Sequence, residues 1–158
     1  MKEKTIMEFQ TIEETERWVK QWAAFLKAGD LIQLQGDLGA GKTQLVQWIG
    51  EIFQVKEAIT SPSFNLVHRY QSPLFPIFHL DCYRMEEAEE ILDLNYEEMF
   101  FNDESLTFIE WGERIEDFLP LDRIILSIEK IGEDARSFQI LSHNERSRDL
   151  EEKMKEAL

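Results

Sequence analysis

The sequence predicts a three-layer α/β protein with a mainly parallel sheet that includes an antiparallel part. Three observations predict this class. Short apolar segments alternate with segments of helical periodicity, one apolar segment runs directly into a glycine-rich loop that opens a helix, and two strand-like segments follow one another late in the chain. Alternating strands and helices are typical of parallel sheets, and consecutive strands joined by a turn are typical of antiparallel pairs.

The first elements are a strand over Thr5 to Phe9 and a helix opened by Thr11, with Glu14 as its capping partner. Gly29-Asp30 is expected to end this helix. Four apolar side chains recur at helical spacing and are expected to face the core: Trp18, Trp22, Phe25 and Leu26.

The middle of the chain begins with a short apolar strand candidate, Leu31 to Gln35, followed by a helix from about Lys42 to Phe53. Two further strands are expected over Phe64 to Tyr70 and Leu74 to Leu80. Pro76 lies within the second of these, so we expect an edge position or a late start for it.

Residues 86–104 contain nine acidic residues and no lysine or arginine, interleaved with apolar ones, and predict one or two short helices. This stretch is interpreted either as a docking face or lid, or as a solvated helix face. A strand over Leu106 to Ile109 follows, and then a helix that stops at Pro120.

The last elements are two strands, Arg123 to Ile128 and Ser137 to Leu141, joined by a turn at Gly132-Glu133-Asp134. The tail, 142–158, is expected to be a charged helix that covers the surface.

Composition limits the classes of function. The 158 residues, 18.7 kDa, fit a single domain spanning 1–158, and 43% hydrophobic residues are enough for a core. The formal charge of −15 argues against unaided nucleic-acid binding, which usually needs a basic surface. Such a charge suits a basic protein partner, or solubility alone.

Cysteine use and apolar run lengths indicate a cytoplasmic protein without a membrane segment. Cys82 is the single cysteine, so no intramolecular disulfide can form. Met1 to Gln10 has no apolar core of a signal peptide, and no apolar run approaches the ~18 residues that span a bilayer.

The clearest motif is G-x-x-x-x-G-K-[ST], which begins directly after a predicted buried strand and opens a helix. Glycines allow the backbone N–H groups to form an anion nest, and the helix N-terminus adds partial positive charge. A lysine then suits the β- and γ-phosphate oxygens, and a hydroxyl suits Mg²⁺. The residues are Gly36, Asp37, Leu38, Gly39, Ala40, Gly41, Lys42 and Thr43. They predict a P-loop NTPase fold.

A P-loop site needs an acidic Mg²⁺ partner at the end of another strand, and two candidates fit, Asp81 and Glu110. Trp111 either lies against the nucleotide or packs in the core. His79 is interpreted as a structural histidine. No asparagine precedes a lysine, so the guanine-reading Asn-Lys-x-Asp motif is missing and adenine is the expected base.

Taken together, these motifs resemble one family, the bacterial tRNA threonylcarbamoyladenosine biosynthesis ATPases TsaE, formerly YjeE. The resemblance rests on the P-loop and on three later segments in the same order and spacing, from about Phe9 to Arg136. These are Ser61-Pro62-Ser63-Phe64, His79-Leu80-Asp81-Cys82-Tyr83-Arg84 and Glu110-Trp111.

The resemblance implies a P-loop ATPase with weak, Mg²⁺-dependent hydrolysis of ATP to ADP. It implies that the ATPase works with two partner proteins, TsaD and TsaB. Together they add threonylcarbamoyl to the adenosine next to the anticodon in tRNAs that read codons beginning with A. The ATPase would reset or activate the partner complex without stable tRNA binding of its own, in keeping with the acidic surface.

The resemblance also assigns roles to individual residues. Lys42, Asp81 and Glu110 would be catalytic, and Thr43 and Glu110 would hold Mg²⁺. Ser61, Pro62, Ser63 and Phe64 would form a switch loop that senses the γ-phosphate. Further nucleotide contacts would come from Gln44, Trp111, Ile12 and Gly132. Ser63 stands where the family commonly has threonine, and Cys82 stands where it commonly has leucine. Cys82 is interpreted either as a redox-active residue or as a small buried hydrophobic residue.

Two other classes remain open. A small-molecule kinase could use the same loop, although such kinases usually carry an arginine-bearing lid and the acidic stretch has none. A pure interaction module with a degenerate site is the other, and the intact Lys42-Thr43 pair and Glu110 argue against it.

Overall fold

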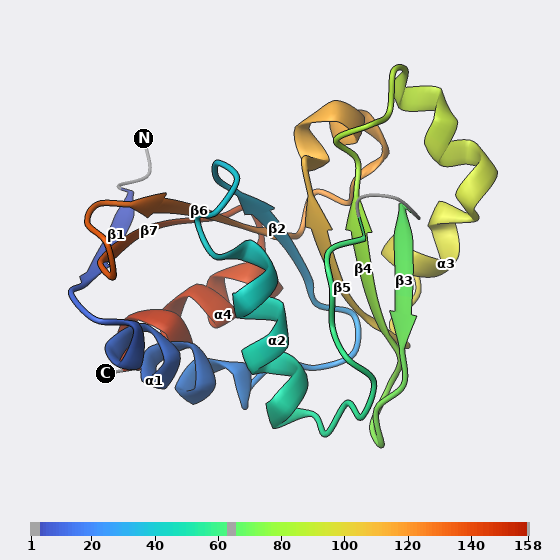
Figure 1. Ribbon diagram of the computed structural model, residues 1–158. Helices are drawn as coiled ribbons and strands as arrows, with labels where there is room; N and C mark the ends of the chain where they lie inside the picture. The colour runs from blue at the N-terminus through green and yellow to red at the C-terminus, as the bar shows by residue number, and fades with distance from the viewer. Residues whose placement is uncertain (1–3, 63–65, 158) are drawn as a thin grey trace.

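Seven strands form one sheet in the computed structural model, which describes residues 4–62 and 66–157 (Figure 1). The strand order is β1-β7-β6-β2-β5-β4-β3. β6, β2, β5 and β4 are mutually parallel, whereas β7, β1 and β3 each run antiparallel to a neighbour. The predicted class is therefore confirmed. The strands are β1 (Thr5–Phe9), β2 (Leu31–Gln35), β3 (Val67–Tyr70), β4 (Ile77–Asp81), β5 (Leu106–Glu110), β6 (Ile124–Lys130) and β7 (Arg136–Ser142).

Helices cover the two faces of the sheet unequally. One face packs on three α-helices, and the opposite face of the β4–β5 end packs on shorter segments (Figure 1). The α-helices on the first face are α1 (Ile12–Ala23), α2 (Lys42–Ile52) and α4 (Glu145–Glu156). The shorter segments are η1 (Ala88–Leu94), α3 (Tyr96–Phe100) and η2 (Gly112–Phe118), where η marks a 3₁₀ helix.

The first helix begins where the sequence predicts and ends earlier. The Thr11 hydroxyl accepts from the Glu14 N–H at 3.1 Å, and the Glu14 carboxylate accepts from the Gln10 N–H at 2.9 Å. Trp18, Trp22 and Leu26 are buried. The prediction for Phe25 was wrong: the helix stops at Ala23, so the helical stripe no longer applies and its ring is 56% exposed.

The strands that carry the two acidic candidates end side by side. β4 and β5 pair in parallel register, with Asp81 opposite Glu110. Of the two alternatives for the strand with Pro76, the late start is confirmed, since β4 begins at Ile77. The strand is not at an edge, because it lies between β5 and β3. Parallel strands that end together bring both carboxyl groups to one edge of the sheet.

Several other boundaries differ from the predictions. β3 begins at Val67, and Phe64 lies outside the described residues. The segment after Glu110 is a 3₁₀ helix that breaks at Ile115, not a continuous helix. The acidic stretch forms two short helices, as predicted.

The C-terminal helix α4 contributes side chains to the core, whereas the sequence predicts a helix that only covers the surface. Leu150 and Met154 are buried, and the Trp18 indole N–H donates to the Met154 carbonyl at 2.8 Å. Among the described residues, no helix combines the length and the apolar character that crossing a bilayer requires.

Candidate nucleotide site

The loop between β2 and α2 has the backbone of an anion-binding nest. Gly39 and Gly41 have φ of 83° and 115°, a region that L side chains rarely adopt. A Cβ at either glycine would meet no heavy atom within 4 Å. The space in front of the loop is therefore open, and the loop's N–H groups and the start of α2 can face an anion there.

Lys42 is the first residue of α2 and is buried. Its ammonium group donates to the Gly36 carbonyl at the other end of the loop. Its Nζ atom lies 3.9 Å from the Glu110 Oε1 atom. The lysine therefore sits between the loop and the acid at the end of β5, where it can shift toward a phosphate oxygen.

A cavity of about 300 Å³ lies in front of the loop, the size of a small-ligand site. The predicted catalytic, metal-binding and loop residues converge here from four separate parts of the chain. They are Lys42 and Thr43 on α2, Ser61, Asp81, Glu110 and Trp111, together with Leu38 and Gln44.

Two contacts fix the acids at this edge. The Asp81 Oδ1 atom accepts from the Tyr83 N–H at 2.9 Å, which orients that carboxylate. Glu110 is buried, and its Oε2 atom lies 2.6 Å from the Nε2 atom of His79. A buried carboxylate is tolerated when it is paired in this way.

Trp111 lines the cavity from a strained backbone position. Its φ of 58° is left-handed, which is uncommon outside glycine and often marks functional sites. Its ring lies 5.0 Å from the Tyr83 ring and 5.4 Å from the Lys42 Nζ atom. The Arg114 guanidinium lies 5.9 Å from the same ring. The aromatic wall is thus shared between the cavity and the second core, a smaller hydrophobic cluster that η1, α3 and η2 form against β4 and β5.

The backbone turn behind Trp111 depends on a close contact. A Cβ on Gly112 would lie 3.0 Å from the Gln33 side chain, so the residue after Trp111 has little room for anything larger. Buried Arg123 donates to the same Gln33 amide at 2.8 Å and to the Pro120 carbonyl at 2.9 Å. These contacts hold η2 against β2 and so fix where Trp111 emerges.

A second cavity, of about 240 Å³, lies on the other side of the P-loop, between α1, α2 and the β6–β7 hairpin. The residues in its wall are mainly apolar. They include Ile12, Gly39, Gln44, Trp48, Ile128 and Phe138. The predicted nucleotide contacts Ile12 and Gln44 therefore reach the loop from two helices.

The predicted contact Gly132 lies in the hairpin turn and not in the wall of this cavity. Its carbonyl accepts from Arg136 at 3.5 Å. The Arg136 side chain does line the cavity, and its Nε donates to the Ala40 carbonyl at 2.9 Å. Arg136 thereby ties the hairpin to the P-loop.

The remaining predicted residues divide into three groups. Asp37 turns the loop through its carbonyl, which accepts from the Ala40 N–H at 3.0 Å. Ser61 faces the cavity and Pro62 is buried. Ser63 and Phe64 lie outside the described residues, and the switch loop as a whole stays a prediction.

The donor set fits a nucleotide–magnesium complex. In the part of the chain that the structure describes, no three histidine, cysteine or acidic residues cluster as a complete protein cage for a metal. Mg²⁺ does not require one, because it is commonly held by one or two carboxylates with phosphate oxygens and waters. Thr43 and Glu110, beside an open loop, match that arrangement.

Sequence reasoning missed two residues of this neighbourhood. The sequence predicts a structural role for His79, although its spacing from Asp81 puts both residues on the same face of a strand and so indicates proximity. Arg136 carries no local motif, and only the tertiary approach of the hairpin brings it to the loop.

Comparison with known proteins identifies the family. The family model described as "Threonylcarbamoyl adenosine biosynthesis protein TsaE" matches residues 9–138. The chain is 38% identical over 124 residues to the Bacillus subtilis tRNA threonylcarbamoyladenosine biosynthesis protein TsaE, covering 78% of this chain and 77% of that one. It is 40% identical over 125 residues to the Rickettsia bellii protein of the same name, covering 78% and 85%.

A solved structure gives the same result for the fold. The crystal structure of YdiB from Bacillus subtilis superposes with a TM-score of 0.81 at 29% identity, covering 99% of this chain and 97% of that one. The agreement over nearly the whole chain includes the strands and helices that build the P-loop site. The chain belongs to the TsaE family.

Proposed function

We propose that this protein is a Mg²⁺-dependent ATPase that acts with TsaB and TsaD in the threonylcarbamoylation of the adenosine beside the anticodon. One observation carries the proposal. The P-loop, Asp81, Glu110 and Trp111 meet around a single cavity in a chain of the TsaE family. The role in tRNA modification is supported by the name that the relatives share, and the ATPase activity is supported by the residues around the cavity.

The two cavities flanking the P-loop suggest how ATP would lie. The cavity that Lys42, Asp81 and Glu110 line with charged groups suits the phosphates, and the cavity beside Trp48 suits the adenine ring. Mg²⁺ would supply positive charge that neutralises the charge developing on phosphoryl transfer. Thr43 and Glu110 would hold that ion, and Asp81 would orient water.

The decisive measurement is the rate of ATP hydrolysis with Mg²⁺, for the protein alone and after addition of TsaB and TsaD. We expect a low rate alone and a higher rate with the partners. A parallel assay follows threonylcarbamoyladenosine formed in tRNA.

Three results would contradict the proposal. A rate of ATP hydrolysis that does not change when TsaB and TsaD are added would contradict a role in their complex. Phosphate appearing on an added metabolite would identify a kinase. Failure to bind ATP or ADP would indicate an interaction module instead.

A further inference from the structure

The buried contact between His79 and Glu110 has no part in the function proposed above. His79 is 0% exposed and projects from the middle of β4, on the same face as Asp81. It is not in the wall of the phosphate cavity, whereas Glu110 is. The imidazole therefore stands behind the carboxylate, on the side away from the cavity.

The contact fixes which oxygen of Glu110 faces which neighbour. The imidazole Nε2 atom lies 2.6 Å from Oε2, and a carboxylate can only accept, so Nε2 carries the shared proton. The other oxygen, Oε1, lies on the side of Lys42, 3.9 Å from its Nζ atom. With Oε2 held, the plane of the carboxylate is set.

The remaining ring nitrogen indicates that this contact determines the imidazole's orientation. His79 Nδ1 has no hydrogen-bond partner among residues 4–62 and 66–157, although it is buried. An unpaired buried polar atom is costly and calls for a physical explanation. The nearby histidine on β3, His68, pairs in register with His79, but its Nδ1 lies 3.0 Å from the Tyr70 hydroxyl instead.

We propose that His79 is a positioning residue that holds Oε2 of Glu110, so that Oε1 stays available as a metal ligand. This inference rests on the proposed function. Without the imidazole, the Glu110 carboxylate can turn and shorten its 3.9 Å distance to the Lys42 Nζ atom. The resulting ion pair would make the carboxylate unavailable to the metal and the lysine unavailable to a phosphate. Partners that orient metal ligands typically change metal affinity by about 10–100-fold when removed.

The test measures Mn²⁺ binding in the presence of ADP by electron paramagnetic resonance, with Mn²⁺ as the probe in place of Mg²⁺. ADP affinity in EDTA is measured separately. For His79→Leu we expect Mn²⁺ affinity to fall about 10–100-fold, while ADP affinity in EDTA changes less than about threefold. His68→Gln is the matched control and is expected to leave Mn²⁺ affinity unchanged.

Two polar variants decide the matter if His79→Leu does not fold. The amide nitrogen of glutamine can reach the position of Nε2, whereas that of asparagine is one bond shorter. We therefore expect His79→Gln to keep Mn²⁺ affinity within about threefold of wild type, and His79→Asn to lose about 10–100-fold. In a Glu110→Gln background, changing His79 should have no further effect on Mn²⁺ affinity.

Three outcomes would overturn the inference. Wild-type Mn²⁺ affinity in both His79→Leu and His79→Asn would show that Glu110 needs no support. Equal loss of ADP affinity with and without metal would show a general structural role. If the wild-type protein binds ADP but never Mn²⁺, the proposed function fails as well, which separates that case from the first two.

Discussion

The ammonium group of Lys42 is held by groups that belong to the site itself. It donates to the Gly36 carbonyl and faces Glu110. Lys42→Ala removes the cation, and hydrogen bonds to charged groups contribute about 1.5–3 kcal/mol. We expect ATP affinity to fall about 10–100-fold and tRNA modification to be lost, measured by calorimetry and by the modification assay.

Lys20→Ala is the matched control for that change. Lys20 is a lysine on α1 whose pairs with Glu16 and Glu51 lie on the surface. Its removal should leave ATP affinity as in wild type, since exposed pairs contribute little. Full modification by a folded Lys42→Ala protein would contradict a role for ATP.

Cys82 is a buried thiol rather than a redox centre. It is 0% exposed, and burial raises the pKa of the thiol to about 12, with a smaller contribution from Asp81. The thiolate is the reactive form, so little of it exists at neutral pH. The position is therefore a small apolar contact beneath η1 and η2, as its place in the second core shows.

Asp30 gives a prediction about pH. Burial raises the pKa of its carboxyl group above the usual value, partly offset by a hydrogen bond from the Lys27 N–H. A raised folded-state pKa means that the free energy of unfolding falls as pH rises through that pKa. Asp30→Asn should therefore raise the melting temperature at pH 7 and leave it unchanged near pH 3, where both forms are neutral.

Thermal unfolding followed by circular dichroism at the two pH values checks this. Asp122→Asn is an informative comparison, because that carboxylate accepts from the Arg146 and Ser147 N–H groups at the start of α4. We expect that change to lower the melting temperature at pH 7. Equal melting temperatures for wild type and Asp30→Asn at pH 7 would contradict the first expectation.

At the scale of elements, the β6–β7 hairpin and the P-loop act as one unit through Arg136. Its side chain donates to the Ala40 carbonyl at 2.9 Å and to the turn carbonyls of Gly132 and Glu133. Removing the guanidinium takes this donor from the carbonyl of buried Ala40, and an unpaired buried acceptor costs about 1–3 kcal/mol. We expect Arg136→Ala to weaken nucleotide binding about tenfold, measured with a fluorescent ADP analogue.

An arginine on α4 provides the control for that prediction. Arg148 is exposed and lines neither of the two cavities beside the P-loop, so Arg148→Ala should bind nucleotide as wild type does. If Arg136→Ala also binds normally, the hairpin does not help to hold the loop.

Elements with local signals could be predicted, and those set by tertiary contacts could not. The glycine pattern of 36–43 determines its own backbone, and Thr11 with Glu14 caps α1 locally. By contrast, α1 ends early, so Phe25 is exposed although helical spacing predicts that it faces the core. The pairing of His79 with Glu110 depends on β4 and β5 lying side by side, which periodicity alone does not determine.

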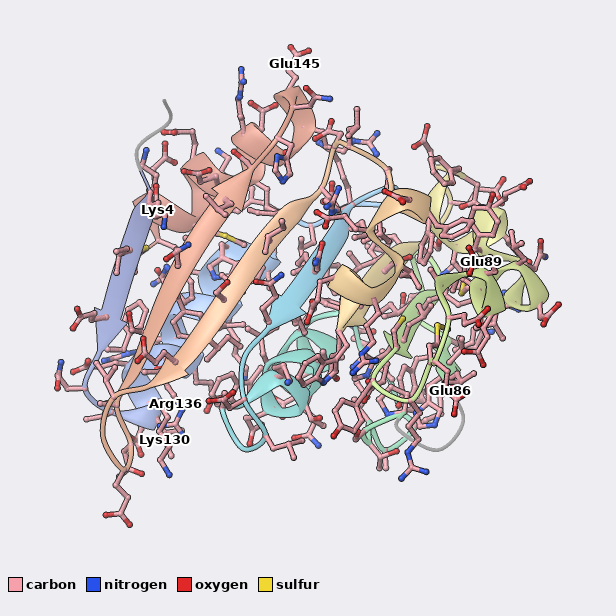
Figure 2. The ribbon with its side chains drawn as sticks, turned by 90° about the horizontal axis from the view of Figure 1, so that it is seen from above. Lys4, Glu86, Glu89, Lys130, Arg136 and Glu145 are labelled. Atoms are coloured by element: carbon pink, nitrogen blue, oxygen red, sulfur yellow. The ribbon has the colours of Figure 1, made fainter. Side chains whose placement is uncertain are left out.

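At the scale of the whole molecule, the net charge of −15 is concentrated in part at one end. Figure 2 shows Glu86 and Glu89 at the end of the molecule opposite Lys4. Both glutamates belong to residues 86–104, a segment that contains no lysine or arginine. Exposed Leu92 and Phe101 lie in the same segment. The repulsion of like charges argues that tRNA does not approach this end, whereas a basic protein surface could.

The charges of residues 86–104 can be reversed while the capping box of η1 stays intact. The carboxylates of Glu87 and Glu90 cap η1, so reversing their charge would unfold what is being tested. Glu86, Glu89, Asp93 and Glu97 are exposed and do not cap η1. Changing these four to lysine brings the net charge from −15 to −7.

If the segment docks on the partners, this fourfold charge reversal should weaken binding to TsaB–TsaD about tenfold or more in a salt-dependent way, since surface charges mainly set attraction and register. A control protein with four exposed glutamates on other elements changed to lysine has the same net charge. Those positions are Glu13, Glu129, Glu133 and Glu156. Calorimetry at low and high salt separates the two cases: equal loss in both variants means that only total charge matters, and unchanged binding in both means that 86–104 is a solvated face.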